Sequence, residues 1–332
     1  MPHPMSASRY ARLLSAVLLS AAALLPAAGA RAGQYPEHPI RLVIPYAPGG
    51  GLTVLGRPLA QKLSEALGQP VIVDTKPGAG TTLGTGIVAR APADGYTLLL
   101  TLAAFATGPS VYARLPYDVE RDFVPIVPVS ASTSILAVHP SVPATDLKEL
   151  AAYARTKPGG VDYASSGTGG DMHLNIASLL DQAGIPGTHI PFNGGGPASN
   201  ALMAGQVDVM LVPASFGLPL VLDGRLRPLA VTTAQRWKKD LTQVPTLAEL
   251  GVADIDVNGW SGIFAPRGTP PEVVARINAE VNRILAEPQF RAFLESVYLT
   301  PLGGKPEDFR ETVGSDVRKW RQVVQRIGLQ PQ

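Results

Sequence analysis

Asp171 and His173 have the types and spacing of an acid–base pair, because a carboxylate close to an imidazole can orient it as a general base. The Gly-x-Ser-x-Gly turn that exposes a nucleophile in many hydrolases does not accompany them. We therefore expect His173 to be a core histidine and Asp171 to be structural. A secreted hydrolase or isomerase that uses His173 and Asp171 is the alternative.

Metal and cofactor chemistry has little support in the sequence. The chain has no cysteine, and His38, His139, His173 and His189 lie too far apart in sequence to form a two-ligand metal spacing. Residues 51–58 imitate a phosphate-binding loop but end in Arg-Pro where Lys-Ser or Lys-Thr is required. We expect no cofactor and no metal.

Glycine-rich loops are the main signal for binding. A predicted buried strand at 40–44 leads into a Pro-Gly-Gly-Gly loop, 48–51, that opens a helix. Glycine allows close approach of the backbone, and the N–H groups of the first helical turn favour an anion. Similar loops at 78–80, 165–170 and 194–196 also follow predicted strands and precede predicted helices. If the two halves of the chain face each other, the four loops line one cleft.

The 165–170 loop is the richest of the four in polar groups. The hydroxyls of Ser166 and Thr168, with the N–H groups from Thr168 to Gly170, could clamp a carboxylate. In the structural alternative, Ser165, Ser166 or Thr168 only caps the following helix.

Two runs of alternating strands and helices must position these loops. Residues 40–101 predict a βαβαβ unit with a mostly parallel sheet, and residues 161–212 predict a second parallel α/β unit. Extended segments at 123–138 and 258–266 are expected to cross between the two domains. We expect domain 1 to comprise 33–135 and 258–332, and domain 2 to comprise 136–257.

Helix signals support this order of elements. Thr145 is the expected N-cap of one helix, and Thr269 with Glu272 predicts a capping box at the start of another. The core face expected for that second helix is Val273, Val274, Ile277, Val281, Ile284 and Leu285. The stripe expected for the last helix is Phe309, Val313, Val317, Trp320, Val324 and Ile327. This last helix should pack on the first domain.

The first 32 residues are typical of a secretory signal peptide. Arg9 and Arg12 precede an apolar run at 13–25, and small residues suit cleavage after Ala30 or Ala32. The run is shorter than the ~20 residues that a membrane span needs. Without a cysteine, neither a lipid anchor nor a disulfide is available, so we expect a periplasmic protein.

Charge excludes several classes of partner. The whole chain has 28 basic and 26 acidic residues, and removal of the three arginines at 9, 12 and 31 leaves 25 basic residues against 26 acidic. Without a basic surplus, nucleic acid and anionic membranes are poor partners.

Several motifs together resemble one family. They are Ile40-Arg-Leu-Val-Ile-Pro-Tyr-Ala-Pro-Gly-Gly-Gly51, Lys76-Pro-Gly-Ala-Gly80, Ala93-Asp-Gly-Tyr-Thr-Leu98, Leu115-Pro-Tyr-Asp118, Tyr163-Ala-Ser-Ser-Gly-Thr-Gly169 and Gly262-Ile-Phe-Ala-Pro-Arg-Gly-Thr-Pro270. In this order they resemble the substrate-binding proteins of tripartite tricarboxylate transporters, the Bug-type periplasmic receptors. The resemblance implies a type II periplasmic-binding-protein fold, α/β in class, with two α/β domains of mostly parallel sheets joined by two crossing strands.

The resemblance also implies closure around a small carboxylate, held mainly by backbone N–H groups, hydroxyls and water. This chain departs from the family pattern at Thr53, where an acidic residue is usual, at Phe192-Asn193 and at Val212-Pro213. These changes make the expected cleft less charged and disfavour an amino-acid ligand.

The expected function is that of a periplasmic receptor that delivers a small organic carboxylate to inner-membrane transporter subunits, or a ligand sensor for a signalling partner. We expect a monomer. The expected ligand-binding residues are Tyr46, Gly50, Gly51, Leu52, Thr53, Gly80, Thr81, Thr82, Ala104, Ser166, Thr168, Gly169, Gly170, Phe192, Asn193, Gly194 and Pro213.

Overall fold

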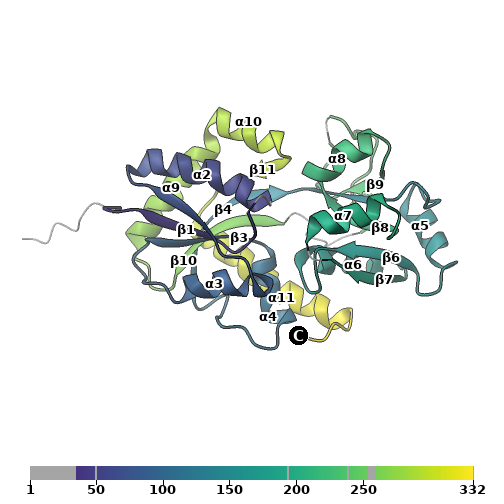
Figure 1. Cartoon of the computed structure of the whole chain (residues 1–332), viewed down its shortest axis with the longest axis horizontal. Coiled ribbons are helices and arrows are strands. Elements are labelled where there is room, and N and C mark those ends of the chain that lie inside the picture. The colour runs from purple at the N-terminus through teal and green to yellow at the C-terminus, as the bar shows by residue number, and fades with distance from the viewer. Residues whose placement is uncertain (1–34, 49–50, 193, 238, 253–258, 332) are drawn as a thin grey trace, which may run out of the picture. The chain divides into compact units, whose positions relative to one another are not determined.

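A six-stranded sheet forms the centre of what we call the first lobe (Figure 1). In spatial order its strands are β11 (Leu299–Pro301), β4 (Phe123–Ser132), β10 (Trp260–Pro266), β3 (Thr97–Leu102), β1 (Ile40–Ile44) and β2 (Val71–Thr75). The central strands are apolar and buried, as expected of strands covered on both faces.

The computed structural model describes residues 35–48, 51–192, 194–237, 239–252 and 259–331. All of its described helices and strands lie in one unit, residues 38–332. The predicted signal peptide, 1–32, lies outside the described residues. Among the helices that the model describes, none has both the length and the apolar character needed to cross a bilayer.

Helices cover both faces of the first sheet (Figure 1). On one face lie α2 (Gly51–Leu67), α9 (Pro271–Ala286) and α10 (Pro288–Ser296), and on the other lie α3 (Thr82–Ala89), α4 (Ala104–Val111) and α11 (Pro306–Arg326). The leucines of α2 at four-residue spacing, 55, 59, 63 and 67, are all buried, as the sequence predicts. A short 3₁₀ turn, η1 (Ala79–Thr81), precedes α3.

A five-stranded sheet forms the second lobe. Its spatial order is β7 (Gly187–Pro191), β6 (Val161–Ser165), β8 (Val209–Pro213), β5 (Ser134–Val138) and β9 (Arg227–Val231). One apolar core contains side chains of α5 (Leu147–Ala154) and α6 (Asp171–Gln182). A second core contains side chains of α7 (Gly195–Met203) and α8 (Ala214–Leu222).

Both sheets are mixed, whereas the sequence predicts mostly parallel ones. The βαβ strands are parallel, as shown by β1 with β2 and β3 and by β6 with β7 and β8. However, β10 runs antiparallel to β3 and β4, and β5 runs antiparallel to β8 and β9. The difference arises because β10, from the second crossing segment, runs opposite to β3, and β5, from the first crossing segment, runs opposite to β8.

The first crossing segment consists of two strands in different sheets. The prediction of one extended stretch over 123–138 is correct for the backbone, but β4 belongs to the first lobe and β5 to the second. Thr133 alone separates them. Ser132 donates its N–H to the carbonyl of Gly259, which ties this segment to the start of the second crossing segment. Position 258 of that second segment lies outside the described residues.

Two predicted helix caps are wrong. The N-cap of α5 is Asp146, whose carboxylate accepts from the Glu149 N–H, while Thr145 donates to the Glu149 side chain. The N-cap of α9 is Pro270, because the Thr269 hydroxyl donates to the Pro266 carbonyl instead of capping the helix. The predicted core face of α9 is correct, since all six of its residues are buried.

The last helix, α11, packs on β4 and α4 of the first lobe, as predicted. Trp260 of β10 donates its indole N–H to Asp316 of α11 at 2.7 Å, and both side chains are buried. Ile327 follows the end of the helix and packs against apolar cores of both lobes. The helix therefore also contacts the second lobe, which the sequence does not predict.

Candidate functional site

The predicted ligand-binding residues lie where parallel strands end and the following segments begin. In the first lobe they follow β1, β2 and β3; in the second they follow β6 and β7, and Pro213 is the last residue of β8. Ligands of open α/β sheets bind at the carboxyl ends of such strands. Gly50 and Asn193 lie outside the described residues, so the described part of the prediction comprises the other fifteen positions.

The first turn of α2 contributes backbone rather than side chains. Leu52 and Thr53 are 5% and 2% exposed, so their side chains point into the first lobe. Gly51 begins the helix, and a side chain at its position would meet nothing within 4 Å. Open space therefore lies beside the backbone at a helix start, which is where anions bind in many proteins.

The η1 turn is held in an unusual backbone conformation. Ala79, Gly80 and Thr81 have φ values of 46°, 58° and 79°, a left-handed run that non-glycine residues rarely adopt. The Tyr112 hydroxyl lies against Gly80, where a Cβ would approach it to 1.8 Å. Glycine is thus required at residue 80, and Tyr112 supports the turn. Such strain is typical of functional sites.

Polar groups near the end of β1 lack good partners. The hydroxyls of Tyr46, two residues after β1, and of Thr101, near the end of the neighbouring strand β3, are buried, and neither makes a well-aligned hydrogen bond within the described residues. Burial raises the pKa of Tyr46, and the neighbouring Asp171 carboxylate raises it further. Asp171 is itself partly exposed, and desolvation raises the pKa of its carboxyl group. A Cβ at Gly259 would lie 3.5 Å from its Oδ2, so the carboxylate faces a crossing segment.

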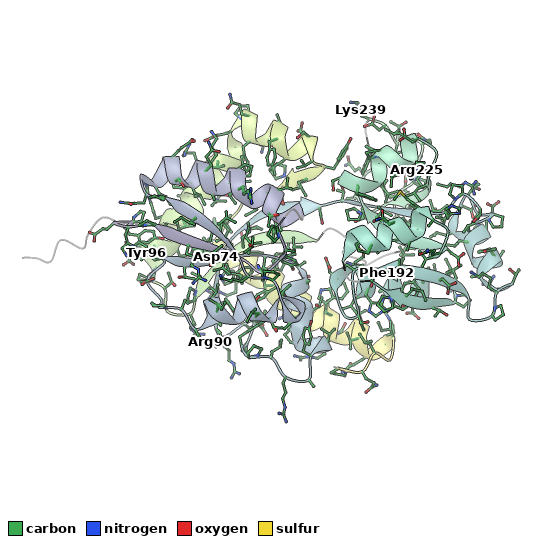
Figure 2. The ribbon with its side chains drawn as sticks, viewed as in Figure 1. Asp74, Arg90, Tyr96, Phe192, Arg225 and Lys239 are labelled. Atoms are coloured by element: carbon green, nitrogen blue, oxygen red, sulfur yellow. The ribbon has the colours of Figure 1, made fainter. Side chains whose placement is uncertain are left out.

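The two predicted loops of the second lobe are joined by hydrogen bonds. Gly194 donates its N–H to the carbonyl of Ser166 at 3.1 Å, and Phe192 donates its N–H to the carbonyl of Ser165. Phe192, labelled in Figure 2, comes from the segment after β7. The structure thus brings together the 165–170 loop and the 192–194 segment. The bond to Ser166 uses the Gly194 N–H, so this group is not available to a ligand.

The backbone N–H of Gly169 does not face a ligand, contrary to the prediction. Its N–H donates to Nδ1 of His173 at 3.0 Å, so it does not point at a ligand. Thr168 and Gly170 keep N–H groups for which the described residues offer no acceptor within hydrogen-bond geometry. The loop can still present these two donors and the Ser166 and Thr168 hydroxyls.

His173 is a core histidine, as predicted. It is 4% exposed, and burial together with His189 lowers its pKa to about 4. The Nδ1 lone pair is used by Gly169 rather than by a substrate proton. A general base that acts near neutral pH needs a pKa close to that pH. This geometry does not suit the pair of His173 and Asp171 for hydrolysis or isomerisation.

Gly169 also connects the lobes. It has φ of 78°, and a Cβ there would lie 2.9 Å from Cβ of Val111, at the end of α4. The other end of α4 begins at Ala104, two residues after the end of β3, where the sequence predicts a ligand contact. Pro213, at the end of β8, pairs with Ser134 at the start of β5. The structure therefore packs the 165–170 loop against the first lobe.

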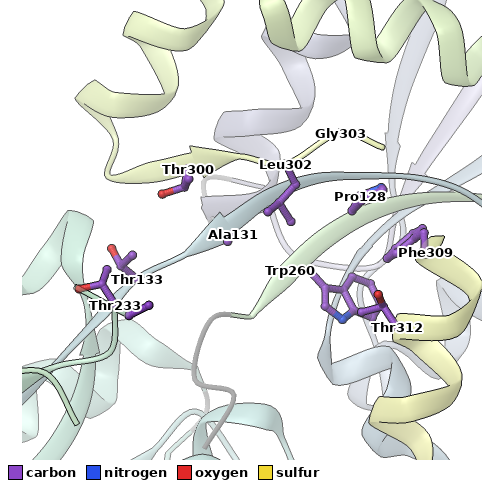
Figure 3. Close-up of a pocket in the computed structure, with 11 residues that line it drawn as sticks. Pro128, Ala131, Thr133, Thr233, Trp260, Thr300, Leu302, Gly303, Phe309 and Thr312 are labelled. Atoms are coloured by element: carbon purple, nitrogen blue, oxygen red, sulfur yellow. The ribbon is translucent and has the colours of Figure 1, made fainter. Parts of the chain in front are cut away.

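A groove of about 540 Å³ lies elsewhere, along β4 and β10 (Figure 3). Threonines 133, 233, 300 and 312 contribute hydroxyls to it, and Trp260, Leu302 and Phe309 contribute apolar surface. None of its lining residues is a predicted ligand contact. Within the described residues, no three His, Asp or Glu side chains are arranged to hold a metal ion.

Sequence reasoning missed three residues that shape the site. Val111 is the last residue of α4 and Tyr112 is its C-cap residue, and the sequence pattern did not reveal this helix. His189 stacks on His173 with ring centroids 3.6 Å apart, although 16 positions separate them. The pairing of Tyr163 with His189 in the parallel strands β6 and β7 is the signal that could have placed it.

A family model described as the tripartite tricarboxylate transporter family receptor matches residues 55–329. Protein BugT of Bordetella pertussis is 34% identical over 324 residues, which cover 96% of this chain and 98% of BugT. The chain spans nearly the full length of this relative.

Two solved structures show the same fold. Rpa4515 of R. palustris, solved with adipate, has a TM-score of 0.81 at 32% identity, with 90% of this chain and 100% of that chain covered. MatC of Rhodopseudomonas palustris, solved with bound malate, has a TM-score of 0.77 at 29% identity, with 87% and 100% covered.

Proposed function

Because the chain belongs to the tripartite tricarboxylate transporter receptor family, we propose that it is a periplasmic receptor that closes on a small organic carboxylate and delivers it to inner-membrane transporter subunits. The observation that carries the proposal is the contact of Gly169 with Val111, which places an N–H-rich loop of one lobe against the other lobe. The adipate and malate bound to similar receptors support the ligand class.

The chemistry of the loops fits a carboxylate. Helix starts at α2, α3 and α6 offer N–H groups and a positive dipole end, and Ser166 and Thr168 offer hydroxyls. Neither Lys nor Arg occurs among the predicted contact residues, so the grip on the anion is made by neutral donors. Neutral donors bind the anion without a buried countercharge, whose desolvation is costly.

The domain boundaries belong to the same proposal. The expected domains are 33–135 with 258–332 and 136–257, so that the first boundary falls two residues after the junction at Thr133 and the second falls in the other crossing segment. Closure then requires ligand contacts on both domains, because a ligand that touches only one cannot favour the closed state. We propose a monomer, since one chain supplies both sides of the cleft.

Binding is tested by thermal unfolding and calorimetry of the mature protein against adipate, malate and hexanoate, with butylamine as a cationic control. A ligand present at 100 times its Kd stabilises the native state by about 2.7 kcal/mol. We expect a carboxylate to raise the melting temperature without added metal. Binding that needs a divalent cation, or chemical turnover of a panel compound, contradicts the proposal.

Delivery is tested separately in cells. Deletion of the gene should abolish uptake of the labelled carboxylate. Genes that the carboxylate induces should still respond when the compound is supplied inside the cell. Normal uptake, with loss only of the transcriptional response, identifies a ligand sensor instead of a transport receptor.

A further inference from the structure

A stacked pair of imidazoles lies directly beneath the 165–170 loop. The rings of His173 in α6 and His189 in β7 are 3.6 Å apart and only 11° from parallel. Tyr163 of β6 stacks against both, with its ring centroid 5.2 Å from His189 and 6.2 Å from His173. The stack therefore joins a helix and two strands behind the loop.

Each imidazole holds a different part of the loop. Nδ1 of His173 accepts the Gly169 N–H at 3.0 Å. The Ser165 hydroxyl donates to the carbonyl of Gly167 at 3.0 Å and accepts the Gly167 N–H. Its one proton is then used, so Nε2 of His189, 2.7 Å away, donates to this hydroxyl. One ring thus fixes the loop near its end and the other fixes its beginning.

We propose that His173 and His189 are positioning residues that hold the 165–170 loop in its ligand-binding shape, and that protonation of His173 releases this shape. With Gly167 and Gly169 secured, the remaining donors of Thr168, Gly170 and the loop hydroxyls are left for the ligand. The effect on affinity rests on the proposed function. The effect on the loop does not, since it is a property of the protein without ligand.

The hydrogen bond from Gly169 determines the required state of His173. An N–H can donate only to an unprotonated nitrogen, so the ring proton of His173 is on Nε2. Protonation of Nδ1 places one donor against another, and Gly169 must then move. Because Gly169 packs on Val111, its movement also disturbs the contact between the lobes.

The stack favours two neutral rings. Two imidazolium ions at this separation would repel each other, and the surrounding protein excludes much of the water that could screen them. Burial lowers the pKa of His189 to about 4, as burial and His189 do for His173. Both rings therefore accept protons only in acid.

Other charged groups have little part in this titration. Tyr163 is the titratable group that stacks on the pair, and burial raises its pKa, so it stays neutral. On α6, Asp171 precedes His173 by two positions, and Asp181 is two turns further on, paired with Arg326 of α11. Among the charged groups, only His189 contributes to the lowered pKa of His173.

The ligand-free experiment uses imidazole and amide NMR of the full mature protein. At pH 7 we expect His173 to be the Nε2–H tautomer, with its Nδ1 coupled through the hydrogen bond to the Gly169 amide. Titration towards pH 4 should shift the Gly169 and Gly167 amides together with both rings. A His173 that titrates near 6.5, or carries its proton on Nδ1 at pH 7, overturns the proposal whether or not a ligand is known.

The binding experiment compares two substitutions at one position. His173→Asn places an amide oxygen near the Nδ1 position and does not titrate, whereas His173→Leu removes the acceptor. With the panel compound that binds the wild type best among adipate, malate and hexanoate, we expect His173→Asn to bind within about threefold of the wild type at pH 7. His173→Leu should bind about tenfold more weakly, which corresponds to about 1.4 kcal/mol.

The pH profile separates positioning from a merely structural role. Wild-type affinity should fall between pH 6 and 4 more steeply than that of His173→Asn. His139→Asn is the matched control, because Nδ1 of His139 also accepts a backbone N–H, that of Ser141, but lies outside the loop. Its profile should match the wild type. Equal profiles for wild type and His173→Asn, with both proteins folded by circular dichroism, contradict the proposal.

Discussion

Arg326 of α11 donates a hydrogen bond to the hydroxyl of Ser178 on α6 at 2.9 Å, and its Nε lies 3.1 Å from Asp181. The first residue belongs to a helix of the first lobe and the other two to a helix of the second. This contact ties the last helix of the first lobe to α6 of the second.

Replacement of Arg326 by Gln should favour opening more than unfolding. Exposed ion pairs are worth less than about 1 kcal/mol, so the melting temperature should change little. The radius of gyration of the ligand-free protein, measured by small-angle scattering, should increase. Arg321→Gln on an exposed position of the same helix is the control for loss of charge. An unchanged radius in both variants shows that Arg326 does not restrain the lobes.

Acid should destabilise the fold through the two stacked histidines. Each has a folded pKa of about 4, below the value of about 6.5 in an unfolded chain, so the native state binds fewer protons between these pH values. Above pH 6.5 both states hold neutral histidines and the free energy of unfolding is unaffected. As the pH falls towards 4, the unfolded chain binds protons that the native state does not, and the free energy of unfolding falls. For the buried His173, the free energy of unfolding should fall by about 1.4 kcal/mol per pH unit in this range. For the more exposed His189 the fall is smaller.

Urea unfolding at a series of pH values measures this slope. The His173→Asn variant should show a shallower fall in unfolding free energy than the wild type from pH 6.5 to 4. A parallel fall in both proteins assigns the acid sensitivity to other groups.

Alanine at residue 169 should reduce ligand affinity at least tenfold. The substitution strains a left-handed backbone, costing about 1–2 kcal/mol, and drives a methyl group into Val111 at the contact between the lobes. Gly184→Ala is the matched control, because φ there is 62° and nothing lies within 4 Å of the new methyl group. Calorimetry should find normal ligand affinity for Gly184→Ala. Its free energy of unfolding should fall by about as much as that of Gly169→Ala loses to backbone strain.

Asp171→Asn should stabilise the unliganded protein at pH 7. Desolvation raises the pKa of this carboxyl group, so the folded state resists its ionisation. The stabilisation should fade as the pH falls and the wild-type carboxyl group becomes protonated. Chemical unfolding of both proteins at pH 7 and pH 4 tests the sign. A variant that is less stable at pH 7 shows that the carboxylate is favourably bonded in the native state.

The sequence predicts those elements whose pattern is periodic and local. The leucines of α2 and the apolar face of α9 repeat at helical spacing, and their burial follows from that spacing alone. In contrast, α4 and α8 contain an internal proline and glycines, and their apolar residues show little amphipathic pattern, so neither was predicted. The short strand β11 is defined only by its partner β4.

The candidate site shows the same division. Glycine-rich turns after strands can be located from sequence, because the turn itself demands glycine. The use of each N–H depends on residues brought by the fold. The bond from Gly169 to His173 could not be inferred from either residue, and the stack of His173 on His189 requires the register of β6 with β7.

Thr133, the single residue between β4 and β5, limits how the two lobes can move. One residue supplies two soft backbone torsions and about 3.5 Å of reach, so along this connection the lobes can rotate but cannot separate. β5 is paired on both sides, with β8 and β9, and Ile135–Val138 are buried, so its register is fixed independently of this junction. A residue inserted beside Thr133 would therefore lengthen the tether and loosen the coupling between the lobes, while leaving the second sheet in register.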